Sequence, residues 1–405
     1  MLKNILKIVL YNISFLFSLL SCLKVFLKLR KKNIDVFFSP EGGFGPTISK
    51  AVILRCKYKQ DNNFVLVFGY SPVRHNRLIS DLFDQNFLWL SLTNKFVPYN
   101  LVSEKYKYLI FKILKYLLKN FSNIKNIEYF NEYFCNLWNI ENFPQEKKNK
   151  FGSYRKIHEF INNNEKYINY NKNVFQKIKE KINLDFNEKK CSIFLRSKGE
   201  NSNDISAKLR DTDIFDNYRL AVESNIKRGW QFFISGDQIE KPEWVKKFSS
   251  SIIFYEDTSL TKDEYNVFTG LYSDCFISSG SGPVSWKFTN LNKPFLVVDG
   301  YPFAFGWYKS IVAYKIINDQ HKFASIEEIF DEKGLEIEPQ VNSSYLNLNE
   351  KNLVISEFLN NTEKKNNDGL SWKDLNLKED CLLNTGHAKA SREWHKIQKL
   401  KFNSK

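Results

Sequence analysis

The stretch Ile34-Asp-Val-Phe-Phe-Ser-Pro-Glu-Gly-Gly-Phe-Gly-Pro46 indicates how this chain folds. It begins with β-branched and aromatic residues, which favour a buried strand, and continues into a glycine-rich loop. A helical pattern follows from Thr47 to about Tyr58, and the next apolar run is Phe64-Val-Leu-Val-Phe68. Strand, glycine loop, helix and strand at this spacing predict a βαβ unit. The first half of the chain therefore opens as a doubly wound parallel sheet.

The same alternation restarts in the second half of the chain. Apolar runs that predict buried strands recur there, separated by helical patterns, at Cys191–Leu195, Trp230–Ile234, Ser251–Tyr255, Cys275–Ser278 and Pro294–Val298. This order is typical of a parallel sheet with helices on both faces. A chain of 405 residues exceeds the roughly 250–300 residues at which a single core tends to split. We therefore expect an α/β protein with two doubly wound, Rossmann-like domains.

The charge and the cysteines limit the possible functions. A formal net charge of +15 suits an anionic partner such as nucleic acid, a lipid surface or a phosphorylated substrate, and selects none of them. The sequence has no zinc-finger spacing, RNP-like motif or basic heptad region, so we expect no nucleic-acid partner. The six cysteines are scattered without a CxxC motif, which is typical of buried thiols in a reducing compartment.

The N-terminus is apolar from Ile8 to Leu23, with lysines before this run and a basic cluster from Lys24 to Lys32 after it. The run is shorter than the ~20 residues that a spanning helix usually needs, and no small-residue cleavage site precedes the basic cluster. We interpret residues 1–32 as an interfacial or signal-anchor helix with the basic cluster on the cytoplasmic side. The alternative is a first helix packed on the folded domain.

A second basic helix is expected between Leu101 and Phe121. Its lysines at positions 105, 112, 115 and 119 fall on one face, and apolar residues occupy the other. This pattern fits a helix that packs on the core and exposes its lysines to solvent, and a membrane-surface role is the alternative.

The stretch Asp274-Cys-Phe-Ile-Ser-Ser-Gly-Ser-Gly-Pro283 is the strongest candidate for a binding site. Small residues at the carboxyl end of a buried strand allow a ligand to approach the backbone, and a helix that begins near Pro283 would direct its positive end toward an anion. A diphosphate would meet both conditions, with hydroxyl and backbone donors from Ser278, Ser279, Gly280, Ser281 and Gly282. The alternative is an ordinary tight turn between a strand and a helix.

Two cations follow another strand of the same predicted sheet. Arg196 has a planar guanidinium that suits phosphate oxygens, and Lys198 adds a second positive charge. Asp237, at the end of a third strand, is placed to contact the ribose of a bound nucleotide or to cap a turn. These cations would neutralise a nucleoside diphosphate leaving group without a metal. Asp211-Thr-Asp213 has the Asp-x-Asp pattern of a metal-binding pair. It precedes a predicted helix, however, where aspartates are usual caps.

Taken together, these motifs carry a family resemblance. Residues 195–308 include Leu-Arg-Ser-Lys198, Ile234-Ser-Gly-Asp237 and Phe276-Ile-Ser-Ser-Gly-Ser-Gly282. They resemble a bacterial family regarded as glycosyltransferases and found with surface-polysaccharide genes. The glycine loop of the first half looks like that family's N-terminal loop. More distantly, the order of motifs is similar to fucosyltransferases and heptosyltransferases with the GT-B fold, in which two Rossmann-like domains face a central cleft.

The resemblance implies a metal-independent glycosyl transfer and no cofactor, because the nucleotide-sugar is a substrate. It places the donor diphosphate against Arg196 and the serine-glycine loop, with the acceptor facing the N-terminal domain. The glycine loop of that domain contains Gly42, Gly43 and Gly45. Pro46 departs from the polar residue that related transferases often have there. An inverting transfer also needs a base near the acceptor hydroxyl, for which Glu41 and His75 are the candidates, with Arg74 and Arg77 as possible contacts to an acceptor phosphate.

We therefore predict a GT-B glycosyltransferase that moves a sugar from a nucleotide-sugar to a surface-polysaccharide or lipid-linked acceptor. Its predicted parts are a membrane-associating helix at 1–32, an acceptor domain at 33–188, a donor domain at 189–345 and a helical and polar tail at 346–405. The predicted location is the cytoplasmic face of the inner membrane. A two-domain nucleotide-sugar epimerase and a non-catalytic membrane-associated binding protein are the alternatives.

Overall fold

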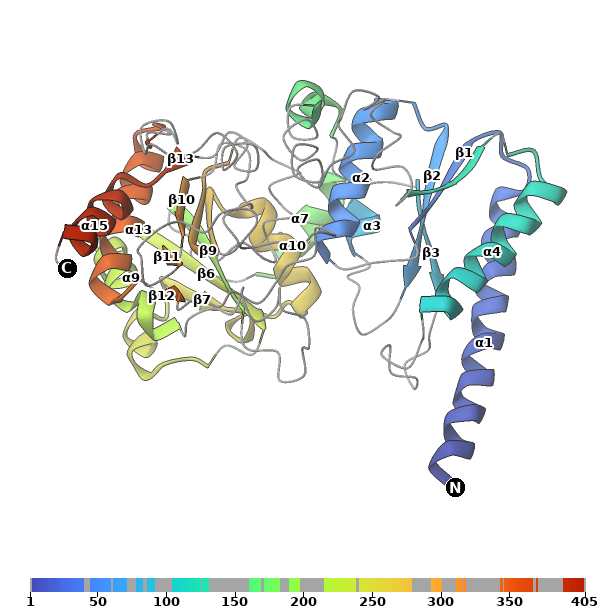
Figure 1. Cartoon of the computed structure of the whole chain (residues 1–405), viewed down its shortest axis with the longest axis horizontal. Helices are drawn as coiled ribbons and strands as arrows, with labels where there is room; N and C mark the ends of the chain where they lie inside the picture. The colour runs from blue at the N-terminus through green and yellow to red at the C-terminus, as the bar shows by residue number, and fades with distance from the viewer. Residues whose placement is uncertain are drawn as a thin grey trace. The chain divides into compact units, whose positions relative to one another are not determined.

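The computed structural model describes most of the chain, and the chain divides into two compact units (Figure 1). Unit 1 comprises Met1–Phe143 and Asn164–Gln176, and unit 2 comprises Pro144–Asn163 and Lys177–Lys405. The described residues are 2–39, 44–59, 61–70, 78–82, 86–91, 104–124, 126–130, 160–168, 171–182, 189–196, 215–237, 240–278, 293–300, 311–314, 316–317, 343–344, 346–366, 369–370 and 389–403.

Unit 1 contains a parallel sheet in the order β3-β2-β1-β4. The strands are β1 (Asp35–Ser39), β2 (Phe64–Tyr70), β3 (Phe87–Ser91) and β4 (Asn126–Tyr129). The chain runs from β1 outward through β2 to β3 and then returns to the other side of β1, which makes the sheet doubly wound. The two strands predicted from the sequence are confirmed, while β3 and β4 were not predicted.

The helices of unit 1 cover this sheet. They are α1 (Leu2–Leu29), α2 (Phe44–Tyr58), α3 (Leu78–Leu82) and α4 (Glu104–Phe121), and a short turn of helix, η2, covers Glu165–Tyr167. The predicted helices are confirmed, and α4 buries Phe111 and Leu114 while Lys112 and Lys119 are exposed. Helix α1 contributes to the same core, so the N-terminal helix is an integral part of unit 1. Helix α7 (Lys172–Glu180) crosses from unit 1 into unit 2.

Unit 2 contains a parallel sheet of seven strands in the order β13-β10-β9-β8-β5-β6-β7. Its strands are β5 (Lys189–Arg196), β6 (Trp230–Asp237), β7 (Ile252–Phe254), β8 (Cys275–Ser278), β9 (Phe295–Gly300), β10 (Ile311–Tyr314) and β13 (Lys389–Ala390). The chain winds from β5 through β6 to β7, then returns to β8 on the opposite side of β5. The five strands predicted in this half are confirmed. A small separate sheet pairs β11 (Ile316–Ile317) with β12 (Ser343–Ser344).

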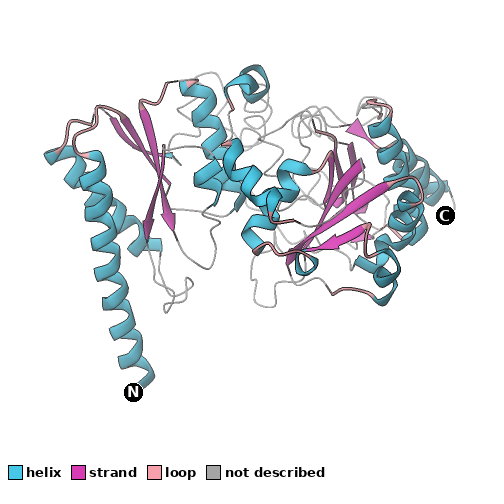
Figure 2. Ribbon diagram, turned by 180° about the vertical axis from the view of Figure 1, so that it is seen from behind, coloured by secondary structure: helices cyan, strands magenta, loops and turns pink. Residues whose placement is uncertain are grey.

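Helices cover both faces of the unit 2 sheet, with α10 on one face and α9, α13 and α15 on the other (Figures 1 and 2). Their bounds are α9 (Arg219–Ile226), α10 (Lys262–Tyr272), α13 (Leu348–Glu363) and α15 (Arg392–Asn403). Short turns of helix cover Phe215–Tyr218 (η3), Glu243–Phe248 (η4) and Tyr255–Asp257 (η5). The predicted fold class, two doubly wound Rossmann-like sheets with an N-terminal apolar helix, is confirmed.

Candidate functional site

The carboxyl edge of the unit 2 sheet contains a topological switch point between β5 and β8. These strands are neighbours, with Phe194 paired to Ser278, yet the chain leaves them in opposite directions. Ligands of open parallel sheets bind outside the carboxyl ends of the strands at such a point, because the connecting loops diverge there. Ser278 is the last residue of β8 and is buried. The start of the predicted serine-glycine loop therefore lies at the switch point.

Two other predicted site residues end the neighbouring strands. Arg196 is the last residue of β5 and Asp237 the last residue of β6, and the two are register partners. The backbones of Arg196, Asp237 and Ser278 therefore share one edge of the sheet, at the ends of three adjacent strands. Lys198, Ser279, Gly280, Ser281 and Gly282 lie outside the described residues, so contacts between these side chains and a ligand stay predictions.

Apolar packing fixes where these strands end. Residues Cys191, Ile193 and Leu195 alternate on β5 with 0%, 0% and 2% exposure, which holds this strand in the centre of the sheet. On β6, Ile234 is buried and is followed by Ser235 and Gly236. Gly236 has a φ of 141°, a conformation that side chains with a Cβ rarely adopt. Two small residues, Ser235 and Gly236, therefore come just before the last residue of β6, and they leave space above the sheet.

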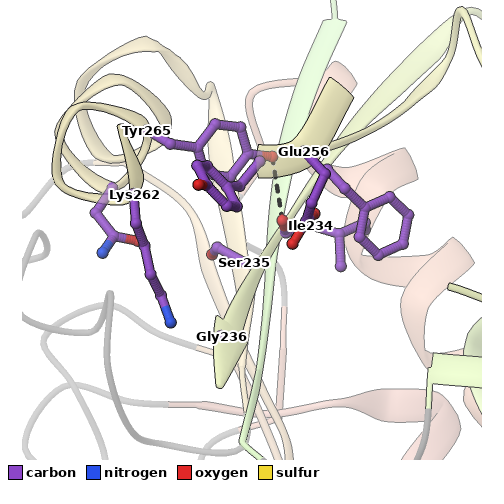
Figure 3. A pocket seen from close by; sticks show the side chains of 9 residues that line it. Ile234, Ser235, Gly236, Glu256, Lys262 and Tyr265 are labelled. Carbon is purple, nitrogen blue, oxygen red and sulfur yellow. Dashed lines mark hydrogen bonds between the residues drawn. The ribbon is translucent and has the colours of Figure 1, made fainter. Parts of the chain in front are cut away.

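A pocket of about 250 Å³ occupies that space (Figure 3). The ends of β6 and β7 and the first turns of α10 line it, through Ile234, Ser235, Gly236, Phe254, Tyr255, Glu256, Lys262, Tyr265 and Asn266. The Tyr265 hydroxyl lies 2.7 Å from the carbonyl oxygen of Ile253 and 3.1 Å from that of Ile234, so it ties α10 to both strands. Thr261 and Glu264 form a capping box that fixes the start of the helix.

Ser235 supplies the pocket with an unsatisfied polar group. Its side chain is 5% exposed, and its Oγ has no hydrogen-bond partner among the described residues. A buried hydroxyl without a partner costs free energy, which a ligand atom would recover by bonding to it. Burial raises the pKa of Tyr265 well above its ordinary value, so this phenol stays a neutral hydrogen-bond donor. The pocket therefore combines a hydroxyl, aromatic surface and the exposed Lys262.

The carboxyl edge of the unit 1 sheet has its own switch point, between β1 and β4. Lys50 of α2 is 5% exposed, and its Nζ donates a 2.7 Å hydrogen bond to Ser39 Oγ at the end of β1. The same Nζ lies 5.5 Å from the ring centre of Phe130, just after β4. This buried cation was missed by the sequence reasoning, because nothing in the pattern of α2 showed that position 50 returns to the strand end.

The remaining unit 1 predictions fall largely outside the described residues. Glu41, Gly42, Gly43 and His75 lie there, as do Arg74 and Arg77. Gly45 belongs to the first turn of α2, so the glycine loop is followed by a helix as predicted. Among the residues with a described structure, no three His, Cys, Asp or Glu side chains gather so as to hold a metal ion. The expected lack of a metal and of a cofactor stays a prediction.

No protein-family model and no curated protein matches the chain. Among solved structures, a crystal structure of POFUT1 in complex with GDP is similar with a TM-score of 0.33 and 12% identity, over 64% of this chain and 95% of that one. An apo-form of POFUT1 gives a TM-score of 0.33 and 11% identity, over 65% and 97%. At this TM-score the similarity carries no inference about activity.

Proposed function

We propose that this protein is a glycosyltransferase that uses a nucleotide-sugar donor bound at the carboxyl edge of the unit 2 sheet. The observation that carries the proposal is the convergence of three polar strand ends, those of Arg196, Asp237 and Ser278, beside the switch point. A cation, a carboxylate and a serine-glycine loop are the groups that a nucleoside diphosphate needs. The sequence motifs that resemble glycosyltransferases contain the same three residues.

The order of the strands suggests how the donor would lie. The diphosphate would bind between Arg196 and the loop that follows Ser278, with Lys198 as a second cation. Asp237 would accept hydrogen bonds from the ribose hydroxyls, as carboxylates at this position of a Rossmann-like sheet do. Beyond β6, the pocket beside Ser235 would receive the base of the nucleotide. Its volume of about 250 Å³ is smaller than the ~300–1,000 Å³ of sites that hold a whole drug-sized ligand, so it would hold only part of the nucleotide.

The acceptor would bind to unit 1 at the switch point between β1 and β4. Glu41 and His75 are the candidates for the base that removes the proton from the acceptor hydroxyl, and the buried Lys50 would give this edge a positive potential. We propose a surface-polysaccharide or lipid-linked acceptor, at the cytoplasmic face of the inner membrane, and a GT-B arrangement for the two units. The charge neutralisation by Arg196 and Lys198 would allow the donor bond to break without a metal.

Calorimetric titration of the full-length protein in mild detergent tests this proposal. UDP, GDP, ADP and CMP would be titrated into the wild type, into Arg196→Ala and into a control, Arg219→Ala, which changes an exposed arginine of α9. We expect one nucleotide to bind, and Arg196→Ala to weaken it about tenfold or more because a charge-assisted bond is lost. The control should keep wild-type affinity.

The outcomes separate the alternatives. Equal affinities in the wild type and Arg196→Ala, or no binding by any nucleotide, would overturn the proposed donor site. Where binding is found, the matching nucleotide-sugars would be incubated with and without membrane glycolipid extracts. Turnover that does not depend on an acceptor would indicate an epimerase. Binding without any turnover would indicate a non-catalytic binding protein.

A further inference from the structure

Helix α1 has an inner face that belongs to the core of unit 1. Ser18, Cys22, Val25, Phe26 and Leu29 are all less than 9% exposed. The four apolar residues, Cys22, Val25, Phe26 and Leu29, belong to one cluster with residues of strands β1 and β2 and of the apolar face of α4. The backbone N–H of Asn123, just after α4, also donates to the carbonyl of Arg30, which follows α1. The second half of α1 is therefore fixed to the folded unit.

The outer face of the same helix is apolar and exposed. Exposure ranges from 41% to 59% for seven large side chains, namely Val9, Ile13, Leu16, Phe17, Leu20, Leu23 and Leu27. Their spacing of mostly three or four residues places them in one stripe along the helix. A surface helix of a water-soluble protein has polar residues on its outer face. A continuous apolar stripe instead marks a surface that contacts a membrane or another protein.

Positive charges border this stripe. Lys24 and Lys28 are exposed on α1, and Arg30, Lys31 and Lys32 follow directly. The residues of α1 include no Asp or Glu. On the neighbouring α4, exposed Lys112 and Lys119 accompany Tyr116 and Phe121, which are 64% and 62% exposed. An apolar stripe with a basic border is complementary to anionic lipid, whereas two copies of this surface would repel each other.

The packing of α1 excludes a simple membrane span. By length and composition, Asn12–Leu29 could cross a bilayer, but 33% of that segment is buried within the protein. Ser14 is the first residue of α1 that the structure describes as buried, and the part of the helix before it is Leu2–Ile13. Twelve helical residues are about 18 Å long, which is shorter than the ~30 Å hydrocarbon core. A bilayer crossing would require α1 to leave the core of unit 1.

We propose that the outer face of α1, with its basic border on α1 and α4, binds anionic lipid in the plane of the membrane surface. The apolar stripe would enter the boundary between headgroups and acyl chains, and the lysines would contact phosphates. Unit 1 would then lie on the membrane as a monotopic domain with its inner core intact. This inference deepens the proposed membrane location, and it depends neither on the donor site nor on sugar transfer.

Vesicle flotation with the full-length protein tests the inference, after detergent is removed in the presence of vesicles. We expect strong binding to phosphatidylcholine vesicles that contain phosphatidylglycerol. The triple variant Leu16→Gln, Leu20→Gln, Leu23→Gln should lose binding at least tenfold. A charge variant, Lys24→Gln, Lys28→Gln, Lys31→Gln, should lose about a hundredfold on anionic vesicles and little on pure phosphatidylcholine. The control, Leu353→Gln with Leu400→Gln, changes exposed leucines of unit 2 and should bind as the wild type.

Three results would overturn the proposal. The first is wild-type binding by the outer-face variant. The second is protection of the N-terminus from protease added outside sealed vesicles, which would show a span. The third concerns the oligomeric state measured by light scattering. If the wild type is a dimer, and the outer-face variant is a monomer that still binds vesicles as the wild type does, the stripe would be a contact with a second copy. Nucleotide affinity of the outer-face variant should match the wild type, so a failure of the membrane surface and a failure of the donor site are distinguishable.

Discussion

Arg196 and Asp237 are register partners at the carboxyl ends of β5 and β6, so the backbones of an arginine and an aspartate end two adjacent strands. We predict that they recognise different parts of one nucleotide. Arg196→Ala should abolish the preference for a nucleoside diphosphate over the nucleoside, because it removes a phosphate contact. Asp237→Asn should reduce affinity for the ribonucleotide about tenfold, and affinity for its 2′,3′-dideoxy form much less, because the lost bond is to ribose hydroxyls. Calorimetry with the nucleoside diphosphate, its nucleoside and its 2′,3′-dideoxy form measures both differences.

The two variants serve as controls for each other. If both variants lower the affinity for all three ligands equally, the substitutions act through the structure of the sheet edge. The assignment of phosphate to β5 and ribose to β6 would then be wrong.

Ser235 gives a prediction about stability and binding together. Its buried Oγ has no partner among the described residues, so Ser235→Ala removes a polar group whose burial is uncompensated. We expect the ligand-free protein to gain up to ~1 kcal/mol in the free energy of unfolding. We also expect weaker nucleotide binding, because the ligand loses a hydrogen bond. Urea unfolding and calorimetry measure the two effects, and a variant that loses stability and keeps full affinity would contradict the role of the pocket.

A buried ion pair joins helix α13 to strand β9 of the unit 2 sheet. Lys351 Nζ of α13 lies 2.9 Å from Asp299 Oδ2 of β9, with side-chain exposures of 0% and 2%. The other oxygen of Asp299 accepts a 2.9 Å hydrogen bond from the backbone N–H of Leu346. Lys351→Met should destabilise the protein by ~3–5 kcal/mol, because it removes the positive charge that faces a buried carboxylate. Urea unfolding measures this loss.

The double variant Lys351→Met, Asp299→Asn distinguishes the missing charge from the missing packing. Asn preserves the acceptor for Leu346, and it tolerates the positive φ of 52° at position 299. We expect the double variant to recover at least half of the stability lost in Lys351→Met. Equal losses in the two variants would show that the isolated charge is not the cause.

The sequence predicted those parts of the fold that periodicity alone determines. Strand β8 has the predicted bounds, Cys275–Ser278, because a short apolar run marks it clearly. Strand β4 was missed because Asn126-Ile-Glu-Tyr129 is half polar and lies at the edge of its sheet. Periodicity also could not reveal that α1 has two different apolar faces, since burial against α4 depends on tertiary packing.

For the site, the sequence predicted which residues end the strands but not which strands are neighbours. Ser278 lies more than eighty positions after Phe194, and only the strand order makes them partners. Lys50 was missed because its contact with Ser39 depends on how α2 packs on the sheet. The Ser235 pocket likewise depends on the placement of α10 over β6 and β7. Such contacts join elements distant in sequence, for which a single sequence has no local signal.

Lys293 predicts a dependence of stability on pH. Burial lowers the pKa of this lysine from 10.5 to about 8, although nearby Asp274 opposes the shift. Between these pH values the unfolded chain binds more protons than the folded protein, so stability rises with pH. We expect a gain of ~1–2 kcal/mol from pH 8 to 10, reduced from the full shift because the residue is partly exposed. Burial also lowers the pKa of Lys351, to about 7, so this lysine adds a gain of its own. In urea unfolding, Lys293→Met should therefore gain less than the wild type by ~1–2 kcal/mol, whereas Lys247→Met, an exposed control, should gain as much as the wild type.

Two N-terminal deletions test whether α1 is a detachable anchor or part of unit 1. Removal of residues 1–32 takes Cys22, Val25, Phe26 and Leu29 out of the core. At ~1.5–3 kcal/mol for each buried apolar side chain, the loss is ~6–12 kcal/mol, comparable with the ~5–15 kcal/mol that stabilises a typical protein. Unit 1 should therefore unfold. Removal of residues 2–11 spares every residue of α1 that the structure describes as buried. This deletion should leave thermal unfolding, followed by circular dichroism in mild detergent, close to that of the full chain. A stable, cooperatively folded protein that begins at residue 33 would show that α1 is only an anchor, and the outer-face stripe would then need a different explanation.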